Sequence, residues 1–410
     1  MKKSVPYILF FVFLALVGGQ DAYVRYLRNR KVKPRNYTVV LSIDAFRSDY
    51  QGLANTPTLD SISKMGVKAK GFQPVFPSLT FVNHYTMATG LYPQNHGIVA
   101  NNFWERGTKR TFSMGDKKTT TQDCFYGGEP IWVTAESQKV KSATISWVGS
   151  DTRQKGYRPS RWSSYNADVP FKARIDSVIE WLNVPYSERP HLAMCYIEET
   201  DNSGHLYGPD SDEIKTSIQK VDSLIAYFMS RLDELSFRDS INFIVLSDHG
   251  MAPISDEKII DLNSFLKSSW VDTLISSPAI SFAYCKKDCE DSLMSALGNV
   301  EGLISWKRAD APERFHYADN KRIGDVVMLS DSGWSQIYTD RRPLPKGMHG
   351  FDNANPLMNG VFYAVGPDFK VGYEAPQLQN IDLYELLCRL LEINPAQNDG
   401  QIERIECVLK

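Results

Sequence analysis

The chain has 410 residues, which is long enough for two or three domains or for one large α/β enzyme domain with insertions. Hydrophobic residues make up 42% and charged residues 23%, which excludes a disordered chain and a fibrous repeat. The 46 lysines and arginines nearly balance 48 aspartates and glutamates, so the formal charge is −2 and no overall basic surface exists for a nucleic-acid backbone. We therefore expect small-molecule partners and no specific binding of nucleic-acid duplexes.

The N-terminal residues have the pattern of a secretory signal. Two lysines precede an apolar stretch from Tyr7 to Val17, and the small residues Gly18 and Gly19 follow. The apolar stretch is shorter than the ~20 residues of a spanning helix, which favours cleavage over anchoring. We predict a signal peptide at 1–19, a basic segment at 20–36 and an exported protein, periplasmic or secreted. An uncleaved membrane anchor is the alternative, because the basic cluster favours retention on the cytoplasmic side.

Three short apolar runs are typical of strands that are buried on both faces of a parallel sheet. They are Tyr37–Ile43, Leu192–Ile197 and Ile241–Leu246. Each run is followed by acidic residues: Asp44 after the first and Asp201 soon after the second. Asp248 and His249 follow the third. Because ligands of open α/β sheets bind beyond the carboxyl ends of the strands, the three strand ends predict one shared crevice.

Apolar residues at helical spacing predict helices between these strands, over 171–182 and 214–232. Asp210 and Glu213 have the spacing of a capping box at the start of the second helix. A third helix is predicted around Leu383–Leu391, because a proline follows shortly after it.

The βα alternation is interrupted between His249 and His349. We predict residues 252–345 as an inserted subdomain within a catalytic domain that spans 37–410. The fold class is therefore α/β, with a mostly parallel central sheet and a smaller inserted subdomain.

The six cysteines contain no spacing typical of a structural zinc site. Spacing alone leaves two disulfides open, and connectivity cannot be read from it. They are Cys285–Cys289 and Cys388–Cys407.

Three of the seven histidines, His205, His249 and His349, stand beside acid or glycine in loop-like contexts. Any one of them alone is more often a satisfied surface or core residue than a ligand. Together with the three aspartates at the strand ends they form an unusual set. Carboxylate oxygens and imidazole nitrogens without a thiolate suit zinc or manganese, and the number of groups is sufficient for two ions.

The segment from Phe76 to Gly90 supplies a candidate nucleophile. Thr80 is predicted to open a short helix that ends at Gly90. A hydroxyl at that position lies near the positive end of the helix dipole and near free N–H groups, which favour an alkoxide and an incoming phosphate. Metal coordination would lower its pKa further. The alternative is that Thr80 is only an N-cap, the commoner role of such a threonine, and this segment does not decide between the two.

The chain resembles the nucleotide pyrophosphatase/phosphodiesterases of the alkaline phosphatase superfamily, and we expect a bacterial member. The resemblance covers nearly everything after residue 36, in the family's order. It is carried by VVLSIDAFRSDY, FPSLTFVNHYTMATGLYPQNHGIVANN, GGEPIWVTAE, WVGSD, YIEETDNSGHLYGP, LSDHGM and GMHGFDN. The resemblance implies an alkaline phosphatase-like three-layer αβα sandwich.

The resemblance also implies a site with two zinc ions per chain. It implies that one ion is held by Asp201, His205 and His349. It implies that the other is held by Asp44, Asp248, His249 and the hydroxyl of Thr80. Thr80 is then the nucleophile.

Further positions match residues that contact substrate in the family. Asn101 matches an asparagine that donates a hydrogen bond to a phosphoryl oxygen. Phe81 and Tyr165 match two aromatic residues that stack on a nucleobase, and Trp147 and Asp151 match other pocket positions. Val82 departs from the family, which commonly has proline there, but a valine removes no functional group from the chemistry.

The implied reaction is zinc-dependent hydrolysis of nucleotide phosphodiester and pyrophosphate bonds through a covalent threonine intermediate, which releases nucleoside 5′-monophosphates. Two in-line displacements predict net retention at phosphorus. A neutral Asn101, where a monoesterase would benefit from a cation, favours diesters. Expected substrates are nucleoside triphosphates, dinucleotides such as NAD, and nucleotide sugars. The alternatives are a phosphodiesterase of choline or lipid headgroups, against which the aromatic pair argues, and a non-catalytic relative that binds metal or nucleotide.

Overall fold

The computed structural model describes residues 35–338 and 343–410. Asn36–Lys410 form one compact unit. The signal peptide predicted at 1–19, and all of the basic segment 20–36 except its last two residues, lie outside the described residues. Within the described ranges, no helix combines the length and the apolar character that crossing a membrane requires.

A central sheet of eight strands forms the framework of this unit. In spatial order its strands are β19 (Tyr373–Ala375), β2 (Val67–Ala69), β18 (Phe362–Val365), β9 (Ile241–Leu246), β1 (Tyr37–Ile43), β8 (Leu192–Ile197), β6 (Ser142–Ile145) and β7 (Arg161–Ser163). β18 runs antiparallel to β9 and β2, and the other neighbouring strands are parallel. The three predicted strands therefore lie side by side, as β9–β1–β8, and the mostly parallel sheet is confirmed.

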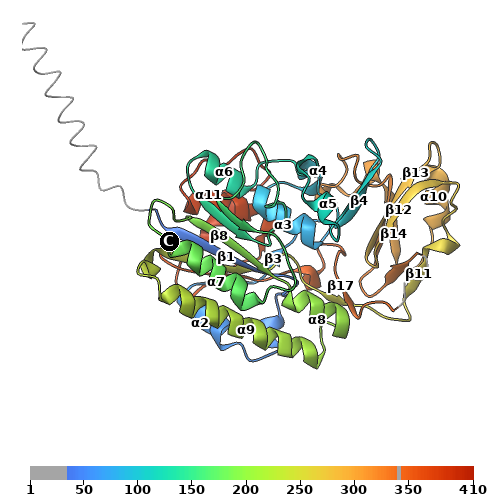
Figure 1. Cartoon of the computed structure of the whole chain (residues 1–410). Coiled ribbons are helices and arrows are strands. Elements are labelled where there is room, and N and C mark those ends of the chain that lie inside the picture. Colours follow the sequence, from blue (N-terminus) through green and yellow to red (C-terminus); the bar gives the residue numbers. More distant parts are fainter. Residues whose placement is uncertain (1–34, 339–342) are drawn as a thin grey trace, which may run out of the picture. The chain divides into compact units, whose positions relative to one another are not determined.

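Helices cover both faces of the sheet because its central strands are apolar on both sides. Val39, Leu41 and Ile43 of β1 enter one core cluster, and Val40 enters the other. The first cluster is covered by α2 (Pro57–Met65), α7 (Phe171–Leu182) and α9 (Asp212–Asp233). The second is covered by α3 (Thr80–Thr89), α6 (Ile131–Ser137) and α11 (Leu383–Leu390). Figure 1 shows these two helical layers with the sheet between them, which confirms the α/β sandwich.

The three predicted helices are present as α7, α9 and α11, but the predicted capping box of α9 is wrong. Ser211 is the N-cap, and its hydroxyl accepts a hydrogen bond from the backbone N–H of Ile214 at 3.2 Å. Asp210 instead accepts a 2.8 Å hydrogen bond from the buried guanidinium of Arg47. Asp210 therefore pairs with a charged residue outside the helix, and Ser211 caps the helix.

The chain between β9 and β18 contains a second sheet of its own. This antiparallel sheet has the order β12 (Val271–Ser276), β13 (Ile280–Cys285), β15 (Val326–Ser330), β14 (Leu303–Lys307). Helix α10 (Glu290–Leu297) packs on it through Leu293 and Leu297, within a separate small core (Figure 1). The boundaries 252–345 stay a prediction.

The remaining helices and strands are short. They are β3 (Phe72–Gln73), α4 (Pro93–His96), β4 (Asn102–Glu105), β5 (Arg110–Ser113), α5 (Lys117–Thr120), α8 (Glu199–Tyr207), β10 (Ala252–Pro253), β11 (Ile259–Asp261), β16 (Ser335–Ile337), β17 (Gly347–Met348) and β20 (Leu378–Gln379).

All six cysteines are free thiols, so neither of the two disulfides that spacing left open is formed. Cys388 is buried within α11, where burial raises the pKa of its thiol. A raised pKa leaves little reactive thiolate at neutral pH. Cys388 therefore acts as a core residue.

Candidate active site

The first group of acidic and imidazole side chains lies where β1 and β9 end. The two strands are parallel and in register, so Asp44 and Asp248 leave the sheet at the same level. The Nε2 atom of His249 lies 3.4 Å from Oδ1 of Asp44 and 3.1 Å from Oδ2 of Asp248. One ligand atom from each residue lies within 4.8 Å of the others, and all three residues are buried. The sheet register therefore assembles one of the two predicted groups.

The second group combines α8 with the segment after β17. Asp201 and His205 lie one turn apart on α8, and Nε2 of His205 is 3.3 Å from Oδ1 of Asp201. His349 brings its Nε2 to 3.6 Å from the same oxygen. Although burial opposes both charges, the attraction between Asp201 and His205 lowers the pKa of the aspartate and raises the pKa of the histidine to about 9. The rings of His249 and His349 stack with centroids 3.8 Å apart, so the two groups adjoin.

Backbone carbonyl groups fix the orientation of the three imidazole rings. The Nδ1 atoms of His205, His249 and His349 lie 2.8, 2.9 and 3.0 Å from the carbonyl oxygens of Gly347, Gly250 and Ser78, respectively. A carbonyl oxygen only accepts, so Nδ1 carries a proton in each ring. Each Nε2 therefore points toward the carboxylates, the arrangement that a second hydrogen bond gives to metal-binding histidines.

Burial shifts the pKa values of the first group strongly. Burial and the neighbouring Asp248 charge raise the pKa of Asp44 well above its usual range, and burial raises the pKa of Asp248 to about 8. Burial lowers the pKa of His249, and it lowers the pKa of His349 to about 4. At pH 7 these two rings are neutral, so their Nε2 atoms offer lone pairs.

Three buried carboxylate oxygens have no hydrogen-bond partner: Asp44 Oδ1, Asp201 Oδ1 and Asp248 Oδ2. Each is an oxygen that faces the Nε2 atom of a histidine. A buried acceptor without a partner costs roughly 1–3 kcal/mol, and more when it is charged. A divalent cation between such oxygens and nitrogens would satisfy both. The two groups therefore fit two metal ions.

Thr80 is the first residue of α3, and its hydroxyl points toward the first group of candidate metal ligands. Leu79 occupies the N-cap position and no side chain caps the helix, so Thr80 is not the N-cap. Oγ1 of Thr80 lies 3.2 Å from Nε2 of His249. The helix ends at Gly90, which has a φ of +66° as its C-cap, as the sequence predicted. The hydroxyl thus lies both at a helix N-terminus and beside candidate metal ligands.

Asn101 approaches the same helix start from the segment before β4. Its side-chain Oδ1 accepts a hydrogen bond from the backbone N–H of Phe81 at 2.9 Å. This contact fixes the amide and, among the described residues, leaves its Nδ2 group without a protein acceptor. Asn101 does not itself line the cavity described next.

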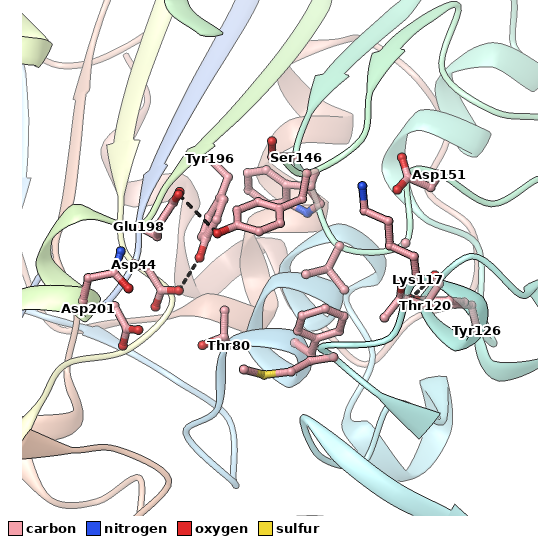
Figure 2. A pocket seen from close by; sticks show the side chains of 17 residues that line it. Asp44, Thr80, Lys117, Thr120, Tyr126, Ser146, Asp151, Tyr196, Glu198 and Asp201 are labelled. Carbon is pink, nitrogen blue, oxygen red and sulfur yellow. Dashed lines mark hydrogen bonds between the residues drawn. The ribbon is translucent and has the colours of Figure 1, made fainter. Parts of the chain in front are cut away.

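A cavity of about 230 Å³ opens from these groups. Four predicted substrate-contacting residues line it, together with Asp44, Thr80 and Asp201. They are Phe81, Trp147, Asp151 and Tyr165. Figure 2 shows Asp44, Asp201 and Glu198 at one end of the cavity and Lys117 and Asp151 at the other. Trp147 is only 2% exposed and donates from Nε1 to the carbonyl of His84, so it forms part of the wall.

Sequence reasoning missed several residues that contact the site, among them Tyr196, Glu198 and His84. Tyr196 donates a 2.6 Å hydrogen bond to Oδ2 of Asp44, and Glu198 lines the cavity. His84 is buried, with Nδ1 at 3.3 Å from Oδ2 of Asp248 and Nε2 at 2.8 Å from the hydroxyl of Ser42. A signal existed for two of them, because His84 lies one turn after Thr80 and Glu198 directly follows a predicted strand.

Two adjoining groups of carboxylate and imidazole side chains, beside the carboxyl edge of a mostly parallel α/β sheet, are typical of metal-dependent hydrolases. The family model described as type I phosphodiesterase/nucleotide pyrophosphatase matches residues 38–352. The chain belongs to this family of hydrolases, which confirms the resemblance in the sequence; a bacterial origin stays a prediction.

Curated relatives agree with this assignment. Human ectonucleotide pyrophosphatase/phosphodiesterase family member 1 is 37% identical over 91% of this chain, and a Schizosaccharomyces pombe protein named an uncharacterized pyrophosphatase/phosphodiesterase is 36% identical over 89%. The matched region spans 42% of the human protein and 79% of the yeast one, so the chain covers less than half of the human relative.

Solved structures of murine ectonucleotide pyrophosphatase/phosphodiesterase 5 share the fold. One has a TM-score of 0.87 at 32% identity and covers 91% of this chain and 100% of the murine chain. A second, an inactive threonine-to-alanine variant in complex with AMP, has a TM-score of 0.88 and covers 92% of this chain.

Proposed function

We propose that this protein is a zinc-dependent nucleotide pyrophosphatase/phosphodiesterase that releases nucleoside 5′-monophosphates through a covalent intermediate on Thr80. One observation carries the proposal: the hydroxyl of Thr80 lies at a helix N-terminus, 3.2 Å from a histidine of one candidate metal group, and lines an aromatic cavity. Family membership and the AMP complex of the murine relative support it.

The proposed zinc ligands are the two groups described above, with Thr80 completing the first. Zinc suits sites of carboxylate and imidazole ligands, and the three buried oxygens without partners favour such a cation. Bound there, two zinc ions would supply positive charge that lowers the pKa of a hydroxyl and stabilises charge on phosphoryl and leaving oxygens.

Each residue of the site then has a separate role in the proposed reaction. Oγ1 of Thr80 forms a bond to phosphorus while the bond to the leaving oxygen breaks, and the hydroxyl proton passes to solvent. The N-terminus of α3 favours the negative charge of the phosphoryl group. The Nδ2 group of Asn101, oriented by its bond to Phe81, donates to a non-bridging oxygen as charge develops. Water then attacks phosphorus, breaks the bond to Thr80 and releases the monophosphate with net retention.

The proposed substrates are nucleoside triphosphates, dinucleotides and nucleotide sugars, with the base between Phe81 and Tyr165. Stacking contributes roughly 1–3 kcal/mol and discriminates weakly among bases, which explains a broad range. Trp147 and Asp151 complete the proposed pocket. We further propose that the protein is exported, since the human and murine relatives are named ectonucleotide enzymes.

The test compares zinc-loaded protein on p-nitrophenyl thymidine 5′-monophosphate, p-nitrophenyl phosphate and p-nitrophenyl phosphorylcholine. The proposal expects the nucleotide diester to be cleaved far faster than the other two. Thr80→Ala should abolish turnover while zinc content stays at two per chain, and Thr80→Ser should retain part of it. Thr216→Ala on the exposed side of α9 is the matched control.

Three outcomes would contradict the proposal in whole or in part. Faster hydrolysis of the phosphorylcholine ester would agree with the proposed metal site, but it would assign headgroup esters as the substrates in place of nucleotides. Metal content without turnover on any ester would indicate a non-catalytic binding protein. An inverted product from a chiral phosphorothioate substrate would refute the covalent intermediate alone.

A further inference from the structure

One ion pair behind the cavity involves two buried residues that the proposed reaction does not use. Arg174 of α7 and Glu198, which precedes α8, have side chains that are only 1% and 9% exposed. The guanidinium contacts the carboxylate twice, from Nη1 to Oε2 at 2.7 Å and from Nη2 to Oε1 at 3.0 Å. A buried pair with this bidentate geometry is fixed in orientation.

The other donors of Arg174 tie the loop between β7 and α7 to the sheet. Nε donates to the carbonyl of Val169, and Nη2 donates to the carbonyl of Asn166. Nη1 also donates to the carbonyl of Tyr196 at the end of β8. All five N–H groups of the guanidinium are therefore used, three of them on backbone carbonyls.

This loop carries Tyr165, a solvent-exposed residue that lines the cavity. Tyr165 is 42% exposed, yet its hydroxyl donates a 3.2 Å hydrogen bond to Oε1 of Glu198, and its ring meets that of Tyr196 edge to face at 6.1 Å. Figure 2 shows the dashed contact that reaches Glu198 beside Tyr196. The ring is thus held at one end by its loop and at the other by a carboxylate.

We propose that Glu198 and Arg174 are positioning residues that hold Tyr165 in place by its hydroxyl, so that the ring is a preformed platform for the nucleobase. This inference rests on the proposed function, because it specifies how the same cavity selects nucleotides. A ring free to rotate would have to be ordered on binding, which reduces affinity. The hydroxyl of Tyr165, and not only its aromatic face, then contributes to specificity.

The test removes the hydroxyl and keeps the ring. Tyr165→Phe should lower the ratio of kcat/KM for p-nitrophenyl thymidine 5′-monophosphate to kcat/KM for methyl p-nitrophenyl phosphate, which has no base, by roughly three- to tenfold. The change should appear in KM for the nucleotide, and the calorimetric Kd for AMP should rise by a similar factor. Adding Glu198→Gln to Tyr165→Phe should change the ratio by less than the product of the two single effects, because both substitutions break the contact between Tyr165 and Glu198.

The matched control is Tyr157→Phe, because Tyr157 is equally 42% exposed and does not line the cavity. It should leave both the ratio and the Kd for AMP unchanged. An unchanged ratio and Kd in Tyr165→Phe, with the wild-type enzyme preferring nucleotides, would overturn the inference alone, since the aromatic face would then suffice. A wild-type enzyme without that preference would overturn the proposed function and, with it, the inference.

Discussion

Replacing one carboxylate of the first metal group should stabilise the metal-free protein and destabilise the zinc-loaded protein. The substitution is Asp248→Asn. In the native chain, Oδ2 of Asp248 is buried without a hydrogen-bond partner and lies 3.1 Å from Nε2 of His249. An amide N–H in that place would donate to the nitrogen, while Oδ1 would keep its 3.2 Å bond from the backbone N–H of Ala45.

The expected magnitude follows from the raised pKa of Asp248. Burial in the metal-free fold raises this pKa from the ordinary value of 3.8 to about 8. A rise of this size corresponds to a destabilisation on the order of 5 kcal/mol once the native carboxyl is ionised. For a folded unit of this size, that free energy corresponds to a rise in Tm of roughly 6 °C.

The effect depends on pH in a definite direction. Burial raises the pKa of Asp248 to about 8 in the metal-free fold, above its value in an unfolded chain. Below about pH 4 the carboxyl is protonated in the native and the unfolded chain and costs no stability. As the pH rises from about 4 to 8, the unfolded chain ionises this carboxyl while the native fold keeps it protonated, so the metal-free protein loses stability until the pH passes 8. The gain from Asp248→Asn should be largest at pH 9 and small at about pH 4.

The assay is thermal unfolding followed by circular dichroism, with a chelator or with saturating zinc. Asp248→Asn should raise Tm with the chelator at pH 9 and lower it with zinc, because a ligand is lost. Asp222→Asn is the control: Asp222 is buried but accepts from the backbone N–H groups of Thr58 and Leu59, so its replacement should lower Tm in both conditions. A lower Tm for metal-free Asp248→Asn at pH 9 would refute the reasoning.

Three further predictions concern other parts of the structure. His205→Ala should reduce bound zinc from two ions to one per chain by elemental analysis, and retention of two would contradict the proposed ligand set. Asn101→Ala should lower kcat/KM for a nucleotide diester by roughly 10²–10³ without changing zinc content, and an unchanged rate would exclude it as a donor to the phosphoryl group. Asp382→Ala should lower stability to urea by about 2–3 kcal/mol, because it leaves the Arg404 guanidinium without its carboxylate; equal stability would show that solvent replaces the contact.

Much of the fold was predictable from local patterns. Residues such as Val39 and Val40 face opposite sides of β1, and continuous apolar strands of this kind require cover on both faces. The same strands end in Asp44 and Asp248, so the position of the site at the carboxyl edge also followed from the order of residues. The start of α3 at Thr80 and its end at Gly90 were similarly local.

Other features of the fold depend on contacts between segments that are distant in the sequence. Asp210 pairs with Arg47, which lies 163 residues away in the chain, so no local pattern could indicate this contact. The four-stranded sheet inside the insertion depends on strand pairings whose partners are far apart in sequence.

The sequence by itself determined which residue types reach the site, because strand and helix periodicity are local properties of the chain. Only the tertiary structure decided how those residues are held. The Nδ1 atom of His349 meets the carbonyl of Ser78, and Glu198 meets both Arg174 and the hydroxyl of Tyr165. Such orientations arise from hydrogen bonds across the folded chain, whose geometry exists only once the layers have packed.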